Sequence, residues 1–309
     1  MFILVLNSSN VVNDGKNSSL IYNFPNSVVL KDKYIAVSQI IMYYSWFNIL
    51  ASYQNNTFSY TWTVGAVTTT YNIVIPDGIY NIADINSYMQ FVMINNGHFL
   101  INANGDNVYY AELLVNQNRY AIQLNTFQVP TSLPAGWAAP GNFAGYPTTV
   151  CNPIVTFPVA FSNIVGYTPI NSVVFSSDGN VGGGYIPPSP ATAASYYATV
   201  NGAGTISYLS NVAPNVQPNS SVYLSMSNIN NPYSQPSSII YAITPTVAIG
   251  EQVIEVPPNF MWNKLIDGTY NQLRFQFLGI DKQPIQLQDP NLTIMMAIRD
   301  KDESAISIK

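Results

Sequence analysis

Residues capable of acid–base or nucleophilic chemistry are scarce in this chain of 309 residues, which contains one histidine, His98, and one cysteine, Cys151. Catalysis near neutral pH usually draws on His, Cys, Lys or paired carboxylates. His98 follows Asn-Asn-Gly, a sequence typical of a helix end, and we interpret it as a turn residue. Cys151 lies far along the chain from His98, and no Gly-x-Ser-x-Gly motif is present. We therefore predict that the chain has no catalytic residues and is not an enzyme.

Patterns that would hold a metal or a phosphate are equally weak. Residues 102–107 resemble a calcium loop, but only Asp106 is charged, whereas calcium takes several carboxylate or carbonyl oxygens. The glycines at 182–184 lack the Lys-Ser/Thr pair that completes a phosphate loop. Asp281 and Asp289 flank a short predicted strand, and we interpret both as residues that initiate turns. We expect no metal site and no cofactor.

Charged residues of every kind are rare. They make up 8 % of the chain, against about 25 % in ordinary proteins, and the 36 asparagines outnumber them. Ten Lys and Arg with a net charge of -5 do not form the basic footprint that nucleic acid requires. No apolar run reaches the roughly 20 residues of a transmembrane helix. We predict neither nucleic-acid binding nor membrane insertion.

The apolar pattern indicates an all-β fold. Period-2 alternation predicts a hairpin over 57–75 and another that pairs 108–115 with 119–128, in which Tyr120, Ile122 and Leu124 share a face. The same alternation predicts strands near 273–277 and 292–298. Only residues 82–95 carry a helical period, with Asn81 or Asp84 as the cap and Gly97 as the stop. One short helix among many strands predicts a β-sandwich or jelly roll.

One segment and one region depart from the rest of the chain. Residues 40–49 place apolar and aromatic side chains on both faces of a strand without any charge. Such a strand is either central and buried within the chain, or it turns one face to a neighbouring subunit. Between Arg119 and Glu251 the only charged residue is Asp178, and this region contains the predicted long loops 130–148 and 178–198.

Six segments spread over both ends of the chain resemble the penton, or vertex minor capsid, proteins of virophages and of Polinton (Maverick) elements. The most specific segment is 31–48, Lys-Asp-Lys-Tyr-Ile-Ala-Val-Ser-Gln-Ile-Ile-Met-Tyr-Tyr-Ser-Trp-Phe-Asn. The others are 4–10, 21–27, 75–82, 231–241 and 287–294. Residues 130–215 show no recognisable match.

The resemblance implies a structural role. It implies a jelly roll formed by residues 1–50 and 205–309, with an insertion domain at 51–204 that is mostly β and contains one short helix. Five copies would close each fivefold vertex of an icosahedral capsid among trimers of a double-jelly-roll major capsid protein. The insertion domain would face outward, where it would contact a host or helper-virus surface. The resemblance thus places the chain in the virion, assembled inside the infected host cell, and carries no catalytic residues.

Two other functions stay open at this stage. A trimeric shell subunit would need two jelly rolls of about eight strands each, which 309 residues hardly allow. A carbohydrate- or receptor-binding jelly roll would use aromatic residues in loops. The aromatic candidates are Trp137, Tyr185, Tyr196 and Tyr197.

Overall fold

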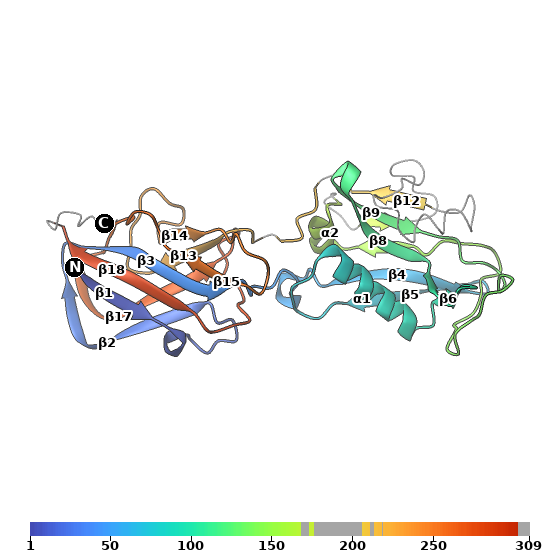
Figure 1. The fold of residues 1–309 in the computed structure, drawn as a ribbon, viewed down its shortest axis with the longest axis horizontal. Helices are drawn as coiled ribbons and strands as arrows, with labels where there is room; N and C mark the ends of the chain where they lie inside the picture. The colour runs from blue at the N-terminus through green and yellow to red at the C-terminus, as the bar shows by residue number, and fades with distance from the viewer. Residues whose placement is uncertain (168–172, 176–205, 211–212, 218, 302–309) are drawn as a thin grey trace. The chain divides into compact units, whose positions relative to one another are not determined.

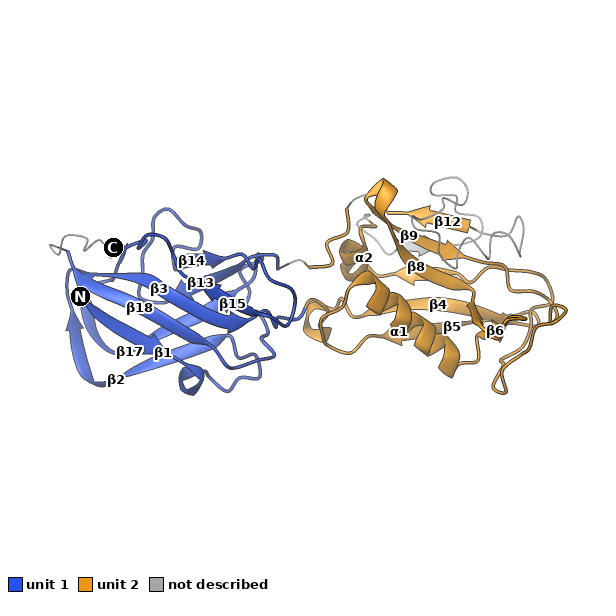
Figure 2. Cartoon of the chain, viewed as in Figure 1, with its two compact units in different colours: residues 1–47, 218–309 blue, residues 48–217 orange. Residues whose placement is uncertain are grey.

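The computed structural model describes residues 1–167, 173–175, 206–210, 213–217 and 219–301 (Figure 1). The chain divides into two compact units (Figure 2). Unit 1 contains residues 1–47 and 218–309, and unit 2 contains residues 48–217. Among the described helices none is long and apolar enough to cross a membrane.

Unit 1 consists of two antiparallel sheets. The first has the order β1-β18-β3-β15, with the short strand β16 also paired to β3, and the second has the order β14-β13-β17-β2. The strands of the first sheet are β1 (Phe2–Leu6), β18 (Thr293–Asp300), β3 (Lys33–Tyr43), β15 (Gln252–Glu255) and β16 (Asn263–Lys264). Those of the second are β14 (Ile239–Ile243), β13 (Val222–Met226), β17 (Gly268–Leu278) and β2 (Ser19–Leu30).

The strand order identifies the sandwich as a jelly roll. When the short β16 is set aside, the strands of unit 1 fall in chain order as β1, β2, β3, β13, β14, β15, β17 and β18. The first, eighth, third and sixth form one sheet, and the fifth, fourth, seventh and second form the other. This is the double Greek-key order of a jelly roll. The all-β jelly-roll prediction is therefore confirmed, and unit 2 enters the chain between the third and fourth strands.

The core of unit 1 follows from the period-2 alternation. Leu4 and Leu6 of β1 point inward with Ile294, Met296 and Ile298 of β18. They pack against the inward residues of the other sheet, which include Leu224, Leu273, Phe275 and Phe277. A change of register between Met295 and Met296, where β18 faces β3, leaves one extra residue on β3. The predicted alternation at 273–277 and 292–298 is confirmed in β17 and β18.

Unit 2 contains smaller antiparallel sheets and two α-helices among its described residues. The sheets have the orders β11-β10-β4-β5, β12-β9-β8 and β6-β7. Their strands are β4 (Thr57–Val64), β5 (Val67–Val74), β6 (Phe99–Ile101), β7 (Asn107–Tyr109), β8 (Ala111–Asn116), β9 (Ala121–Thr126), β10 (Val155–Phe157), β11 (Val173–Phe175) and β12 (Ile206–Leu209). The helices are α1 (Ile82–Asn95) and α2 (Val159–Val165).

Helix α1 begins and ends where the sequence predicts. The side chain of Asn81 accepts a hydrogen bond from the backbone N–H of Asp84, and the Asp84 carboxylate accepts one from the N–H of Asn81, so the two residues form a capping box. Gly97 adopts φ +69° just after the helix. A Cβ on Gly97 would lie 1.9 Å from the backbone oxygen of Asn142, so both conformation and space require glycine here.

The structure departs from the sequence predictions in unit 2. Both hairpins are present as β4–β5 and β8–β9, but Tyr120 does not share a face with Ile122 and Leu124. It adopts φ +51° at the turn and is 80 % exposed, so that prediction was wrong. Helix α2 was not predicted, because its seven residues offer too short a period and follow a proline at the N-cap, Pro158.

The boundaries of the two units also differ from the expected ones after residues 50 and 204. Asn48 belongs to unit 2 because its side-chain amide bonds the backbone of Tyr80 and Val216. Strand β12 belongs to unit 2 because it pairs with β9. The resemblance implied that residues from 205 onward belong to the jelly roll, whereas β12 pairs with β9 in unit 2.

Each unit holds together the two chain segments that enter and leave it. In unit 1 the indole Nε1 of Trp46 donates to the backbone oxygen of Asn219 over 2.9 Å, and Trp46 is fully buried. In unit 2 the amide nitrogen of Asn48 donates to the backbone oxygen of Val216 over 2.7 Å. The ends of the insertion are therefore adjacent within each unit.

This adjacency predicts that the jelly roll folds without unit 2. We expect a chain in which a short Gly/Ser linker replaces residues 49–216 to unfold cooperatively, because a short linker adds little loop-closure entropy when the ends already meet. Thermal unfolding followed by circular dichroism checks this expectation. In the same shortened chain, Trp46→Phe leaves the buried Asn219 carbonyl unpaired and is expected to cost about 1–3 kcal/mol. Unfolding without a cooperative transition in the shortened chain would contradict the expectation.

Candidate functional site

His98 lies in a closed aromatic cluster of unit 2. Its ring stacks on Trp62 with centroids 4.6 Å apart, and its Nδ1 lies 2.8 Å from the Tyr60 hydroxyl. Tyr71 meets the ring edge to face at 4.4 Å. The side chain is fully buried, and burial lowers the pKa of His98 to about 4. A neutral imidazole without access to solvent supports packing and does not reach a substrate.

The other residues singled out for chemistry lie apart or bond locally. Asp106 accepts a hydrogen bond from the side chain of Asn102, whose own oxygen accepts backbone N–H groups of the same turn. Asp281 and Asp289 each accept a backbone N–H two residues further on, as turn-initiating residues do. Cys151 is a free cysteine.

Metal-binding clusters and the remaining aromatic candidates add no site. In the described part of the chain no three His, Cys, Asp or Glu side chains gather around a common point. Trp137 is half-buried and packs against a small core in unit 2. The glycines at 182–184 and the candidates Tyr185, Tyr196 and Tyr197 lie outside the described residues.

A polar network that the sequence did not reveal lies on one face of the β12-β9-β8 sheet. Asn125 is at its centre: its nitrogen donates to Glu112, and its oxygen accepts from Ser207 and Gln123. Gln123 in turn accepts from Asn116 over 2.7 Å. All five side chains are at most 4 % exposed. Burial raises the pKa of Glu112 to about 7, although the hydrogen bond from Asn125 opposes the shift.

Alternation at Glu112, Gln123 and Asn125 was the signal available in the sequence. A polar residue at every second strand position normally indicates the solvent face of a sheet. In this unit the polar face is buried as well, and neutral amides satisfy one another there. The sequence thus indicated the face correctly but not its burial.

The first sheet of unit 1 presents an apolar face away from the sandwich core. Ile3 and Val5 of β1 alternate with buried Leu4 and Leu6, and they are 58 % and 44 % exposed. The cross-strand register aligns Val5 with Met295 and Gln39, and it aligns Thr293 with Ile41 and Ile254. We call this outer surface of β1, β18, β3 and β15 the apolar face.

Charge is nearly absent from the apolar face. Among its described strand positions the charged outward residue is Arg299, at one end, where its guanidinium lies 4.3 Å above the Trp262 ring. Ile254, on the edge strand β15, is 57 % exposed. Ile41 and Tyr43 from the aromatic segment 40–49 face outward here, whereas Ile40 and Met42 face the core. Within β3 the segment is thus buried on the core side only, whereas Tyr44, Ser45 and Trp46, which follow the strand, are all buried.

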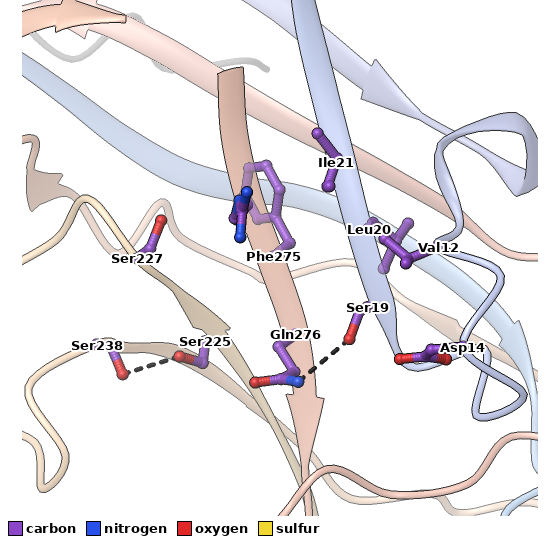
Figure 3. Close-up of a pocket in the computed structure, with 11 residues that line it drawn as sticks. Val12, Asp14, Ser19, Leu20, Ile21, Ser225, Ser227, Ser238, Phe275 and Gln276 are labelled. Atoms are coloured by element: carbon purple, nitrogen blue, oxygen red, sulfur yellow. Dashed lines mark hydrogen bonds between the residues drawn. The ribbon is translucent and has the colours of Figure 1, made fainter. Parts of the chain in front are cut away.

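The second sheet of unit 1 presents the opposite chemistry on its outer surface. Arg274 and Gln276 alternate with the core residues of β17, and Gln276 aligns with Ser225 and Ser19 on the neighbouring strands. These residues line a groove of about 470 Å³ (Figure 3). Figure 3 also shows two hydrogen bonds across the groove, from Ser225 to Ser238 and from Gln276 to Ser19. We call this surface the polar face.

The buried carboxyl of Glu112 makes stability depend on pH in a predictable direction. Its pKa is near 4.5 when unfolded and about 7 when folded. The cost of burying the charge is therefore absent below pH 4.5, grows as the pH rises, and is complete above pH 7. We expect Glu112→Gln to raise the free energy of unfolding at pH 8 by on the order of 3 kcal/mol, with little gain near pH 4.5. Urea unfolding at the two pH values measures the difference.

The exposed Glu251→Gln is the control for this experiment, because its carboxylate contacts solvent in both states. Protonation of His98 affects the variant and the natural chain equally, so it cancels in the difference. Equal stability of the Glu112→Gln variant and the natural chain at pH 8 would show that Glu112 is not buried as a charge.

Comparisons with known proteins identify similar folds at low sequence identity. No protein-family model and no curated protein matches the chain. The structure is similar to the mavirus penton protein, with a TM-score of 0.40 and 7 % identity over 96 % of this chain and 98 % of that one. It is also similar to a chain of the Sputnik virophage structure, with a TM-score of 0.37 and 10 % identity over 96 % of this chain and 97 % of that one. The first is a penton protein, the class that the sequence resembles.

Proposed function

We propose that the chain is a structural penton protein, whose homopentamers close the fivefold vertices of an icosahedral viral capsid. The observation that carries the proposal is the apolar face, an outer sheet surface of the jelly roll that lacks charge except at one end. The jelly-roll order of unit 1 and the resemblance of residues 31–48 to penton proteins agree with it.

The energetics of the apolar face favour a covered surface. Burying a fully exposed Ile or Val side chain gains about 1.5–3 kcal/mol, so a half-exposed one gains roughly half of that. Ile3, Val5 and Ile254 are each about half exposed in the isolated chain and are aligned on one sheet surface. Exposed apolar side chains on a surface with few charges are typical of a protein–protein interface. A ring of five copies requires a heterologous contact, in which this face of one copy meets a different patch of the next.

The rest of the proposal concerns partners and location. Trimers of a double-jelly-roll major capsid protein would surround the pentamer, and unit 2 would contact a host or helper-virus surface. The protein would reside at the capsid vertex of the virion after assembly inside the infected host cell. It would have no enzymatic role. A trimeric shell subunit is less well supported, because the described strands contain one jelly roll and the sheets of unit 2 have other orders.

A charge placed on the apolar face tests the proposal. We expect native mass spectrometry at capsid-like concentration to give a particle of about five chain masses. Val5→Glu is expected to raise the dissociation constant of the pentamer at least about 100-fold, because an unpaired buried carboxylate costs several kcal/mol. The matched control is Val29→Glu, a valine on the other sheet that is 68 % exposed.

Different failures have different meanings in this test. Trimers in place of pentamers would overturn the penton proposal. Pentamers that survive Val5→Glu would exclude the apolar face as the interface, although the pentamer itself would still agree with a penton protein. If the isolated chain stays monomeric, coexpression with the major capsid protein and negative-stain microscopy decide whether it occupies fivefold vertices.

A further inference from the structure

The polar face contains two adjoining hollows that share lining residues. The first, of about 470 Å³, lies over β13, β17 and β2, and the second, of about 510 Å³, lies toward the start of β17. Arg274 and Ser227 line both hollows. Hollows of this size suit a ligand of one or two small rings each. The two hollows adjoin at Arg274 and Ser227, and from here on the groove means both hollows together.

Neutral hydrogen-bonding groups line much of the groove, beside the apolar residues Val12, Leu20, Ile21 and Phe275 of the first hollow. The first hollow presents the hydroxyls of Ser19, Ser225, Ser227 and Ser238 with the amide of Gln276. Ser225 donates to Ser238 over 2.8 Å, and Gln276 donates to Ser19 over 3.1 Å, so these groups hold one another in place. The second hollow adds Asn228, Thr269, Tyr270, Asn271 and Gln272. Such a lining matches a ligand rich in hydroxyl groups.

Arg274 supplies the charge at the centre of the groove. When the Gln272 amide is oriented with its oxygen toward Arg274, that oxygen accepts hydrogen bonds from Nη2 over 3.0 Å and from Nε over 3.1 Å. This contact fixes the guanidinium and leaves its other N–H groups directed elsewhere. The ion pairs among the described residues join Lys33 to Asp300 and Lys264 to Asp32, and neither uses Arg274. A fixed guanidinium without a carboxylate partner is suited to bind a carboxylate in bidentate fashion.

Other features of the groove narrow the class of ligand. Strand β17 pairs with β13 on one side and β2 on the other, so it offers no free backbone edge to an extended peptide. A single arginine does not make a nucleic-acid site. Asp14 is the one carboxylate that lines the first hollow, and it accepts the backbone N–H of Lys16. It would repel a second acidic group, which favours a ligand with one carboxylate among many hydroxyls.

We propose that this groove binds an acidic oligosaccharide, with the carboxylate of one sugar on the Arg274 guanidinium and the hydroxyls of its neighbours on the serines and amides around it. This site lies on the polar face and uses none of the residues of the apolar face. It also differs from the aromatic loop residues that the sequence suggested for carbohydrate binding. It is independent of whether the chain forms pentamers.

Calorimetric titration of the full chain with a panel of acidic disaccharides tests the proposal. The panel contains glucuronate, galacturonate and N-acetylneuraminate, each linked to a neutral sugar, together with the methyl ester of each. We expect at least one acid to bind about tenfold or more tightly than its ester, because a charge-assisted hydrogen bond to arginine exceeds a neutral one. Arg274→Gln is expected to remove that difference.

The matched control is Lys282→Gln, which removes the same charge elsewhere in unit 1, where Lys282 lies 3.4 Å from the centroid of the Tyr223 ring. We expect this variant to keep the preference for the acid. Thermal unfolding verifies that both variants are folded; since Arg274 is exposed, we expect little change. Binding by none of the acids, equal binding of acid and ester, or an equal loss in Lys282→Gln would each overturn the proposal. So would binding of an acidic tripeptide when no disaccharide binds.

Discussion

The pairing of β18 with both β1 and β3 is the contact on which the jelly roll of unit 1 depends. In the first sheet β1 is an edge strand that pairs with β18, and β3 connects β18 to β15. The second sheet has the same dependence, because β2 is joined to it only through β17. Strands β1 and β2, near the start of the chain, therefore join the sandwich through β18 and β17, which lie near its end. Unit 2 is inserted between β3 and β13, so its two ends must stay adjacent. The hydrogen bonds of Trp46 to Asn219 and of Asn48 to Val216 hold these ends together.

The two outer surfaces of the jelly roll differ because their strands have different patterns. Strands β3 and β18 carry apolar residues on both faces, whereas β17 alternates apolar residues with Gln272, Arg274 and Gln276. Both patterns build the same core, so the fold alone does not require the difference. An apolar outer surface costs solubility unless it is covered, and a polar one keeps its hydrogen bonds in water. The difference is therefore best explained by function: one face suits a neighbouring chain, and the other suits solvent or a polar ligand.

Local features of the fold could be predicted from the sequence, and the remote ones could not. Helix α1 followed from its period and from Asn81 and Gly97, and both hairpins followed from alternation across short turns. The order of strands in the jelly roll did not, because pairing between residues some 290 positions apart, such as Phe2 with Ile298, leaves no local pattern. The resemblance implied a jelly roll, but it assigned no strand order to this chain. Candidate sites followed the same rule: Arg274 was visible on an alternating strand, but its groove depends on β13 and β2, which are distant in sequence.

The shortage of charge has a different cause in each unit. In unit 1 the shortage is confined to the apolar face. Charged residues such as Arg274, Lys282 and the ion-paired Lys33 and Lys264 lie elsewhere on the surface. In unit 2 it follows from burial. The chain from residue 120 to residue 250 contains one charged residue, Asp178, so this stretch offers no cation to stabilise an ionised Glu112. Amides satisfy that network instead, and burial shifts both Glu112 and His98 toward their neutral forms. A unit that contains polar groups but excludes charge can bury them on both faces of a sheet, because each amide both donates and accepts a hydrogen bond.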